Sequence, residues 1–243
     1  MKKIQIAIIG IAMLLLASCK EEAEKPKVTY DTAGKIRAIA KPDSSQIQVA
    51  GLPLLMDGTD YLIHPVGDVS IREKGVKSRY GSSSVNDLSF TISNYGEYEI
   101  TGYLQNLKFQ KVNSDSIRKL TDKPVLIQTA TYLKSVADRT KNQIMVYTMF
   151  DMDTNKDTKL DTSDIKALYM SDISGDRFTK ISLDFQELID WKLISSLNRL
   201  YYRTVEDTNK NGEFDKNDVV NYYFIDLAKK EWKTIGYEPV LQE

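Results

Sequence analysis

The chain has 243 residues, with 33 lysines and arginines against 34 aspartates and glutamates, one histidine and one cysteine. A nearly neutral charge that is mixed along the chain gives no basis for a nucleic-acid partner, because phosphate backbones are bound by clustered cations. A zinc site needs several histidine or cysteine ligands, and an internal disulfide needs two cysteines, so both are excluded by composition.

The N-terminus carries a targeting signal. Lys2 and Lys3 precede an apolar run that ends at Leu16, too short for a permanent membrane helix but typical of a signal peptide. The run closes with Leu-Ala-Ser-Cys, which resembles a bacterial lipobox. That resemblance implies a lipoprotein signal peptide over residues 1–18 and a lipid on the sulfur of Cys19. The alternative is an ordinary signal peptide with an incidental cysteine.

Residues 19–29 are predicted to form a lipidated flexible tether. The stretch Lys20 to Lys27 (K-E-E-A-E-K-P-K) has almost nothing to bury. Its start also resembles the acidic signals that direct some Gram-negative lipoproteins to the cell surface. We therefore expect a lipid anchor in the bacterial outer membrane, facing the periplasm or the exterior. Residues 30–243 are long enough for a single domain with a substantial core.

Strands dominate the predicted elements. Fourteen tyrosines in a β-branched background favour strands over helices, and only Thr131–Arg139 favours a short helix. We therefore expect an all-β fold. In chain order the predicted strands are 88–92, 98–104, 126–132, 144–150, 168–173, 178–183, 187–197, 200–205, 222–227 and 232–235.

Two acidic twelve-residue loops interrupt this pattern, 54 positions apart. Asp153–Asp164 reads DTNKDTKLDTSD and Asp207–Asp218 reads DTNKNGEFDKND. Both place oxygen-bearing side chains at loop positions one, three, five, nine and twelve. Calcium takes about six to eight oxygen ligands from such a coiled segment, so both loops are predicted to bind Ca²⁺. The terminal Asp is similar to that of dockerin loops, whereas a sensor EF-hand loop ends in Glu.

The same spacing assigns the ligands. In the first loop they are Asp153, Asn155, Asp157 and Asp164, with Asp161 through water and Lys159 through its carbonyl oxygen. In the second loop they are Asp207, Asn209, Asn211 and Asp218, with Asp215 through water and Glu213 through its carbonyl oxygen.

The loops differ at position six, and one neighbouring acid is a further candidate. Gly212 fits the sharp turn at position six, whereas Thr158 lacks that freedom. Asp151 is either a further ligand or a solvated residue. The alternative for both loops is an acid-rich surface turn without metal.

The loops belong to an internal repeat. An offset of 54 aligns Tyr147 with Tyr201 and Phe178 with Trp232, giving units of about 143–183 and 197–237. Each unit is predicted as strand, acidic loop, strand, turn and strand, with strands rather than EF-hand helices entering the loops. A related hairpin without a calcium loop is predicted at 107–120.

Two phrases, ALYMSDISGDRFTKIS and NYYFIDLAKKEWKTI, resemble TolB-type β-propeller repeats. The chain is also similar to uncharacterised secreted bacterial lipoproteins that carry EF-hand-like loops within β-rich repeats. The resemblance implies propeller-like repeats of short antiparallel strands, with the two calcium loops inserted between strands.

These features favour a non-enzymatic binding or scaffold module in which calcium is structural, with an unknown protein or glycan partner. His64, the single histidine, is expected to be structural. The alternative is a glycan-binding or glycan-hydrolysing domain. Its candidate platform is Tyr201, Tyr202, Tyr222, Tyr223, Trp191 and Trp232, which equally suit a packed sheet. A flat aromatic face favours binding, and two carboxylates about 5–10 Å apart in a groove favour hydrolysis.

Overall fold

The computed structural model describes residues 25–30, 46–72, 75–78 and 92–240. The predicted signal peptide, Cys19 and all but the last residue of the predicted strand 88–92 lie outside the described residues. Strands account for 48% of the structure and helices for 6%, and every strand pairing among the described residues is antiparallel. The all-β class expected from the sequence is therefore confirmed.

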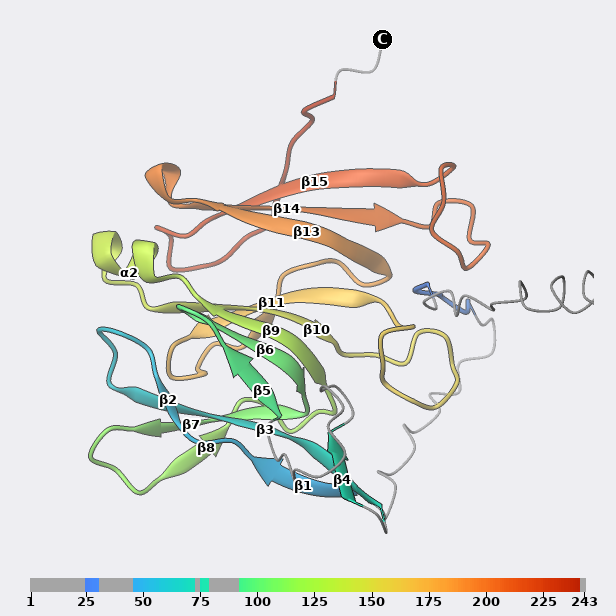
Figure 1. Cartoon of the computed structure of the whole chain (residues 1–243). Helices are drawn as coiled ribbons and strands as arrows, with labels where there is room; N and C mark the ends of the chain where they lie inside the picture. Colours follow the sequence, from blue (N-terminus) through green and yellow to red (C-terminus); the bar gives the residue numbers. More distant parts are fainter. Residues whose placement is uncertain (1–24, 31–45, 73–74, 79–91, 241–243) are drawn as a thin grey trace, which may run out of the picture.

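The strands form three sheets that lie in layers (Figure 1). The lower sheet has the order β1-β3-β7-β8, with β2 and β4 also paired to β3. Its strands are β1 (Gln46–Ala50), β2 (Leu54–Leu55), β3 (Tyr61–Arg72), β4 (Gly75–Ser78), β7 (Asn106–Lys111) and β8 (Ile117–Lys119).

The middle sheet has the order β12-β11-β10-β9-β6-β5, and the upper sheet has the order β13-β14-β15-β16. A short helix, α2 (Lys134–Thr140), connects β9 to β10, close to the predicted helix at 131–139. The middle strands are β5 (Ser93–Tyr95), β6 (Glu99–Leu104), β9 (Leu126–Tyr132), β10 (Ile144–Phe150), β11 (Lys166–Asp172) and β12 (Thr179–Lys180). The upper strands are β13 (Gln186–Ile194), β14 (Arg199–Glu206), β15 (Val219–Asp226) and β16 (Ile235–Gly236).

Two hydrophobic cores hold the layers together. Between the lower and middle sheets, Leu107 and Phe109 pack in one cluster with Tyr147. Between the middle and upper sheets, Val146 packs with Tyr202. Because successive side chains of a strand point to opposite faces, Val146 and Tyr147 enter different cores. The middle sheet is thus covered on both faces, which explains why all seven residues of β10 are buried.

The predicted calcium units have the predicted order of elements. Strands β10 and β14 enter the two loops, and β11 and β15 leave them. The expectation of strands rather than EF-hand helices at these positions is confirmed. Strands β9 and β10 also have the predicted bounds of 126–132 and 144–150.

The residue alignment of the two units needs one correction. Tyr147 pairs with Tyr169, and Tyr202 pairs with Tyr223. Tyr202, rather than Tyr201, is therefore the structural counterpart of Tyr147. Each of these two tyrosines belongs to the core shared with the preceding sheet. The offset is thus 55 in β14 and 54 from the loop onward, because the first unit has one extra residue between its strand and its loop.

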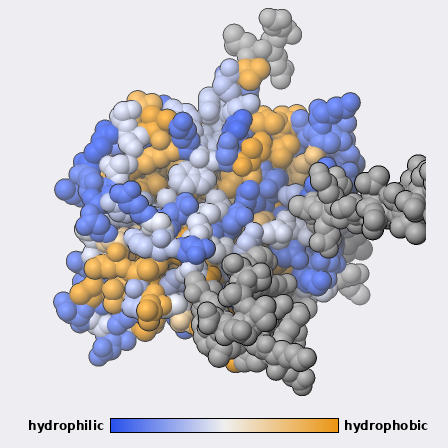
Figure 2. Space-filling view, in the orientation of Figure 1, coloured by the Kyte–Doolittle hydropathy of each residue, from blue (hydrophilic) through white to orange (hydrophobic). Residues whose placement is uncertain are grey.

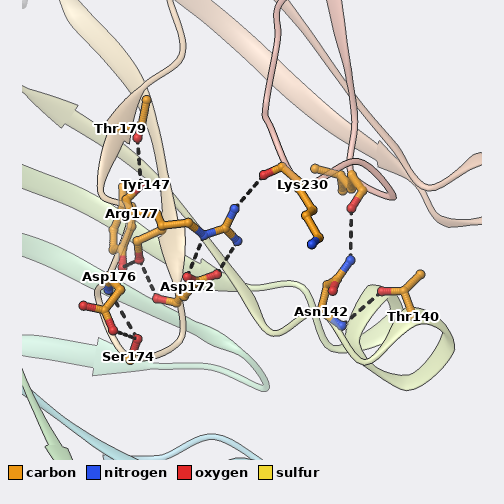
Figure 3. Close-up of polar contacts among 11 residues, drawn as sticks. Thr140, Asn142, Tyr147, Asp172, Ser174, Asp176, Arg177, Thr179 and Lys230 are labelled. Atoms are coloured by element: carbon orange, nitrogen blue, oxygen red, sulfur yellow. Dashed lines mark hydrogen bonds and ion pairs between the residues drawn. The ribbon is translucent and has the colours of Figure 1, made fainter.

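Arg177 links the middle and upper sheets at the end opposite the loops (Figure 3). Its Nε donates to the Asp172 carboxylate at 2.7 Å, and its Nη1 donates to the Lys230 carbonyl at 2.8 Å. The guanidinium carbon lies 4.1 Å from the centre of the Trp232 ring, a cation–π contact. One arginine thus fixes the turn after β11 against the turn after β15.

We expect alanine substitutions to cost more stability between two sheets than on the outer face of the upper sheet. Leu168 is fully buried between the middle and upper sheets, and Tyr222 is its counterpart on the outer face of the upper sheet. We expect Leu168→Ala to lower the free energy of unfolding by about 2–5 kcal/mol, because it leaves a cavity. Tyr222→Ala should cost clearly less. Urea denaturation of both variants measures the difference, and equal losses would contradict the layer assignment.

Candidate metal centres

The two acidic loops lie at the same end of the molecule (Figure 1). One joins β10 to β11 and the other joins β14 to β15. The surface is strongly hydrophilic over the β14–β15 loop (Figure 2). Because each loop closes the same hairpin of a repeated unit in adjacent layers, the stacking of the sheets brings the loops near each other.

Six internal hydrogen bonds recur in both loops. In each loop the side-chain oxygens accept hydrogen bonds from main-chain N–H groups of the same loop. The side chain at position one accepts from the N–H at position six, that at three from the N–H at five, and that at five from the N–H at seven. The side chain at position nine accepts from the N–H at eleven, and that at twelve accepts from the N–H groups at two and nine. The donor–acceptor distances of these twelve bonds run from 2.7 to 3.1 Å. Two loops of different sequence therefore reach one conformation, which the side-chain oxygens hold in place.

Every predicted side-chain ligand takes part in this arrangement. The ten side-chain candidates each accept at least one of these main-chain hydrogen bonds: Asp153, Asn155, Asp157, Asp161, Asp164, Asp207, Asn209, Asn211, Asp215 and Asp218. Lys159 and Glu213 occupy position seven, where their N–H groups donate to position five.

The carboxylates of the loops are partly withdrawn from water. Asp164 is fully buried, and Asp207 is 3% exposed. Burial raises the pKa of Asp164, although main-chain N–H groups of Asp161, Thr154 and Asn155 act in the opposite direction. Asp153 Oδ1 is buried and has no hydrogen-bond partner among the described residues. An unpaired buried oxygen costs free energy, and a cation in the loop would remove that cost.

The donor set fits calcium better than a softer metal. No three His, Cys, Asp or Glu side chains converge as a metal cluster in the part of the chain that the structure describes. The candidate donors are instead mixed, since carboxylates alternate with Asn amides and with a main-chain carbonyl at position seven. All are oxygen donors, which hard cations such as Ca²⁺ prefer.

The loop backbone is left-handed at positions four and six in both copies. Lys156 and Lys210 have φ of 63° and 56°, while Thr158 and Gly212 have φ of 71° and 86°. A left-handed φ is unfavourable for a β-branched residue, so the first loop carries strain at Thr158 that the second loop avoids at Gly212.

Asp151 is neither a loop ligand nor a freely solvated residue. Its Oδ2 accepts hydrogen bonds from Lys180 Nζ at 2.8 Å and from the Tyr169 hydroxyl at 2.7 Å. Burial and this carboxylate raise the pKa of Tyr169. Asp151 therefore ties the strand entering the first loop to β11 and β12.

The other sequence candidates are distributed over the fold. His64 lies on β3 and hydrogen-bonds to Gln110 through Nε2 at 3.0 Å, which is a structural contact. The six aromatic candidates do not form one platform. Tyr202 and Tyr223 face the core between the middle and upper sheets, with Trp191 and Trp232 packed against it.

A cavity of about 570 Å³ lies between α2 and the turn that follows β15. Asn142, Arg177, Lys230 and Trp232 are among its lining residues. Arg177 is committed to Asp172 and to the Lys230 carbonyl (Figure 3). Arg177 in the cavity wall therefore serves the contact between the sheets.

Residues 27–29, which the sequence places in the flexible tether, contact the loops in the structure. The N–H groups of Lys27, Val28 and Thr29 donate to Ser163, Gly212 and Thr154 carbonyls, at 3.0, 3.0 and 2.8 Å. The folded part thus includes Lys27, ahead of the expected start at residue 30. The sequence signal was the run Val28-Thr29-Tyr30, which is β-branched and aromatic after a charged stretch.

Comparison with family models, with curated proteins and with solved structures gives no match. Within the described ranges, no helix is long and apolar enough to cross a membrane.

The strain at Thr158 gives a direct test of the loop geometry. We expect Thr158→Gly to raise the free energy of unfolding by about 0.5–1 kcal/mol. Relief of the left-handed φ contributes about 1–2 kcal/mol, and the freer unfolded chain offsets part of it. The control is Thr158→Ala, which keeps a Cβ and should gain less. Urea denaturation in chelator provides the measurement, and a loss of stability in Thr158→Gly would refute the strain.

Proposed function

We propose that the protein is a calcium-binding lipoprotein of the bacterial outer membrane, anchored through Cys19, that acts as a non-enzymatic binding or scaffold module. Calcium binding is supported by the shared hydrogen-bond arrangement of the two loops, together with the buried, unpartnered Oδ1 of Asp153, and the anchor is supported by the Leu-Ala-Ser-Cys sequence. Oxygen donors fixed by main-chain N–H groups are prepared to meet a hard cation without large rearrangement.

Calcium would have a structural role. It would be held by the side-chain oxygens at positions one, three, five and twelve and by the carbonyl oxygen of Lys159 or Glu213. Bound calcium would neutralise crowded ligand carboxylates, of which the first loop has four and the second has three, with the Glu213 carboxylate as a further acid outside the ligand set. It would also fix the connections β10–β11 and β14–β15.

Affinity is expected to be moderate. Asp at position twelve is shorter than Glu, and Thr158 strains the first loop. We expect dissociation constants of about 10⁻⁵ to 10⁻³ M, near those of extracellular calcium modules. Millimolar calcium outside the cell would keep such sites filled and would stabilise the fold by mass action.

We also infer a relation between these sheets and propeller blades. Strands β9–β12 and β13–β16 are consecutive four-stranded antiparallel units. The β7–β8 hairpin repeats the β11–β12 hairpin, since Leu120 N donates to Leu107 O and Ile181 N donates to Leu168 O, both at 2.8 Å. This agreement supports a repeat that is common to all three sheets. In the lower sheet, the repeat has no calcium loop.

Calcium-dependent thermal stability tests the role of the loops. In the full chain in detergent, millimolar calcium should raise the melting temperature relative to chelator, because binding stabilises the folded state. The double variant Asp153→Asn, Asp207→Asn keeps oxygens that accept the main-chain hydrogen bonds but removes two charges. It should lose most of the rise, whereas Asp115→Asn, at an exposed site away from the loops, should retain it. A full rise in the double variant would exclude these loops as the sites.

A glycan-binding role is the second candidate, favoured by the outer face of the upper sheet. In the middle sheet, the positions directed at the next sheet are Ile144, Val146, Leu168 and Met170. By the same alternation, their counterparts on the outer face of the upper sheet are Arg199, Tyr201, Tyr222 and Phe224. Aliphatic core positions are thus replaced by aromatic and cationic side chains.

These residues gather with Tyr237 into one aromatic cluster. Tyr237 packs edge-on against Tyr201, with ring centres 5.5 Å apart, and Arg199 lies 4.4 Å from the centre of the Phe224 ring. Asp190 beside them is paired with Arg203 at 2.8 Å. Aromatic faces next to planar polar groups suit stacking on a sugar ring, and a paired Asp190 favours binding over hydrolysis.

Glycan array binding tests this surface. The double variant Tyr201→Ala, Tyr222→Ala should weaken binding of any recognised glycan by about tenfold or more, because the stacking area is removed. Tyr95→Ala removes an exposed tyrosine of the middle sheet and serves as the control. Unchanged binding in the double variant would locate the glycan elsewhere, and no binding by the wild type would remove this candidate function.

A further inference from the structure

Residues 27–30, which we call the docking segment, lie between the two loops (Figure 1). The main-chain N–H groups of Lys27 and Thr29 donate to the first loop, at Ser163 and Thr154, and the N–H of Val28 donates to the second loop at Gly212. Three consecutive residues therefore bond alternately to one loop and the other.

Side chains strengthen the contact with the first loop. Thr154 Oγ1 donates to the Lys27 carbonyl at 2.9 Å, and Thr29 Oγ1 donates to the Asn155 carbonyl at 3.2 Å. The N–H of Thr154 also donates to Asp164 Oδ1 at 2.7 Å. One residue thus contacts both the docking segment and the carboxylate that closes the first loop.

The second loop makes an equivalent connection through Gly212. Its N–H donates to Asp207 Oδ2 at 2.7 Å, and its carbonyl accepts from Val28. A Cβ at Gly212 would lie 2.4 Å from the Val28 carbonyl oxygen, so the segment and the loop are in close contact. Val28 itself is 5% exposed.

Tyr30 lies beside the second loop. Its ring packs against Phe185, with ring centres 6.2 Å apart. Burial and the nearby Asp207 carboxylate raise the pKa of Tyr30 to about 12.

The docking segment does not compete with the predicted calcium ligands. The carbonyl oxygens that it uses belong to positions two, three and eleven of the first loop and position six of the second. The ligand carbonyl in each loop is at position seven. Calcium and the docking segment can therefore be bound at the same time.

We propose that the docking segment couples the two calcium loops, so that calcium fills them cooperatively and its removal releases residues 27–30 from the domain. This inference rests on the proposed function, because it requires both loops to bind calcium. Calcium would stabilise the loop conformation to which the segment bonds, and the segment in turn favours that conformation. Such coupling is reciprocal by thermodynamic necessity.

Release would also change the reach of the anchor. Residues 27–30, about 13 Å long when extended, would no longer hold the chain that begins at Cys19 against the domain.

Hydrogen exchange on the wild-type full chain in detergent tests the release. With calcium, the amides of Lys27, Val28 and Thr29 should exchange at least about tenfold more slowly than in chelator. Amides of β10, far inside the middle sheet, give the reference for global stability. Protection of the segment that does not change with calcium would overturn the proposal, and this measurement needs no variant that has to fold.

Calorimetric titration with calcium tests the coupling. Val28→Pro removes the N–H that bonds to Gly212 without altering a loop residue. We expect it to weaken calcium binding by about fivefold or more and to abolish cooperativity. Val28→Ala keeps the N–H, and Lys25→Pro places proline at an exposed residue, so both should retain cooperative binding.

The outcomes separate the two proposals. Absence of calcium binding in the wild type would overturn the proposed function and this inference with it. Calcium binding that is the same in Val28→Pro and the wild type would leave the proposed function standing and overturn the coupling alone.

Discussion

The structure depends on the burial of the middle sheet on both faces. Every residue of β10 is buried, and two adjacent residues of this strand, Val146 and Tyr147, belong to the cores on its opposite faces. A sheet covered on both faces requires a second and a third layer, so the lower and upper sheets pack against its two faces (Figure 1). Because the middle and upper sheets use the same unit in the same orientation, their acidic loops emerge at one end. The position of the candidate metal centres follows from this packing.

Repulsion between carboxylates destabilises the end of the molecule that carries the two loops. Asp164 and Asp207 are buried carboxylates, and each sits in a loop with further acids. Main-chain N–H groups offset part of the cost by donating to them, as Thr154 does to Asp164. These donors fix the positions of the oxygens but do not neutralise their charge. The loops are therefore well formed, and acids outnumber lysines in each of them, whereas the single charge of Asp151 is met by Lys180.

The sequence was most informative where local pattern and tertiary packing agree. Strand β10 is a continuous apolar run, so its bounds were predicted correctly. The twelve-residue β3 was missed because Pro65 and Gly67 interrupt its pattern, although Pro65 pairs with Leu107 in the middle of the sheet. The ungapped alignment paired Tyr147 with Tyr201 instead of Tyr202. The first unit has one extra residue before its loop, so an offset of 54 is correct only from the loop onward. Hydrogen bonds from Val28 across about 180 residues leave no local trace, so no pattern in the sequence identifies their partners.

The contacts of Lys27, Val28 and Thr29 affect how the protein is best prepared for experiment. A recombinant form that starts at residue 30, where composition alone places the domain boundary, would lack all three main-chain donors and the buried Val28 side chain. Its loops would keep their own hydrogen bonds but would lose the strand-like segment between them. Measurements of metal affinity or stability on such a fragment would describe a different molecule, whereas a form that keeps residues 25–30 retains these contacts.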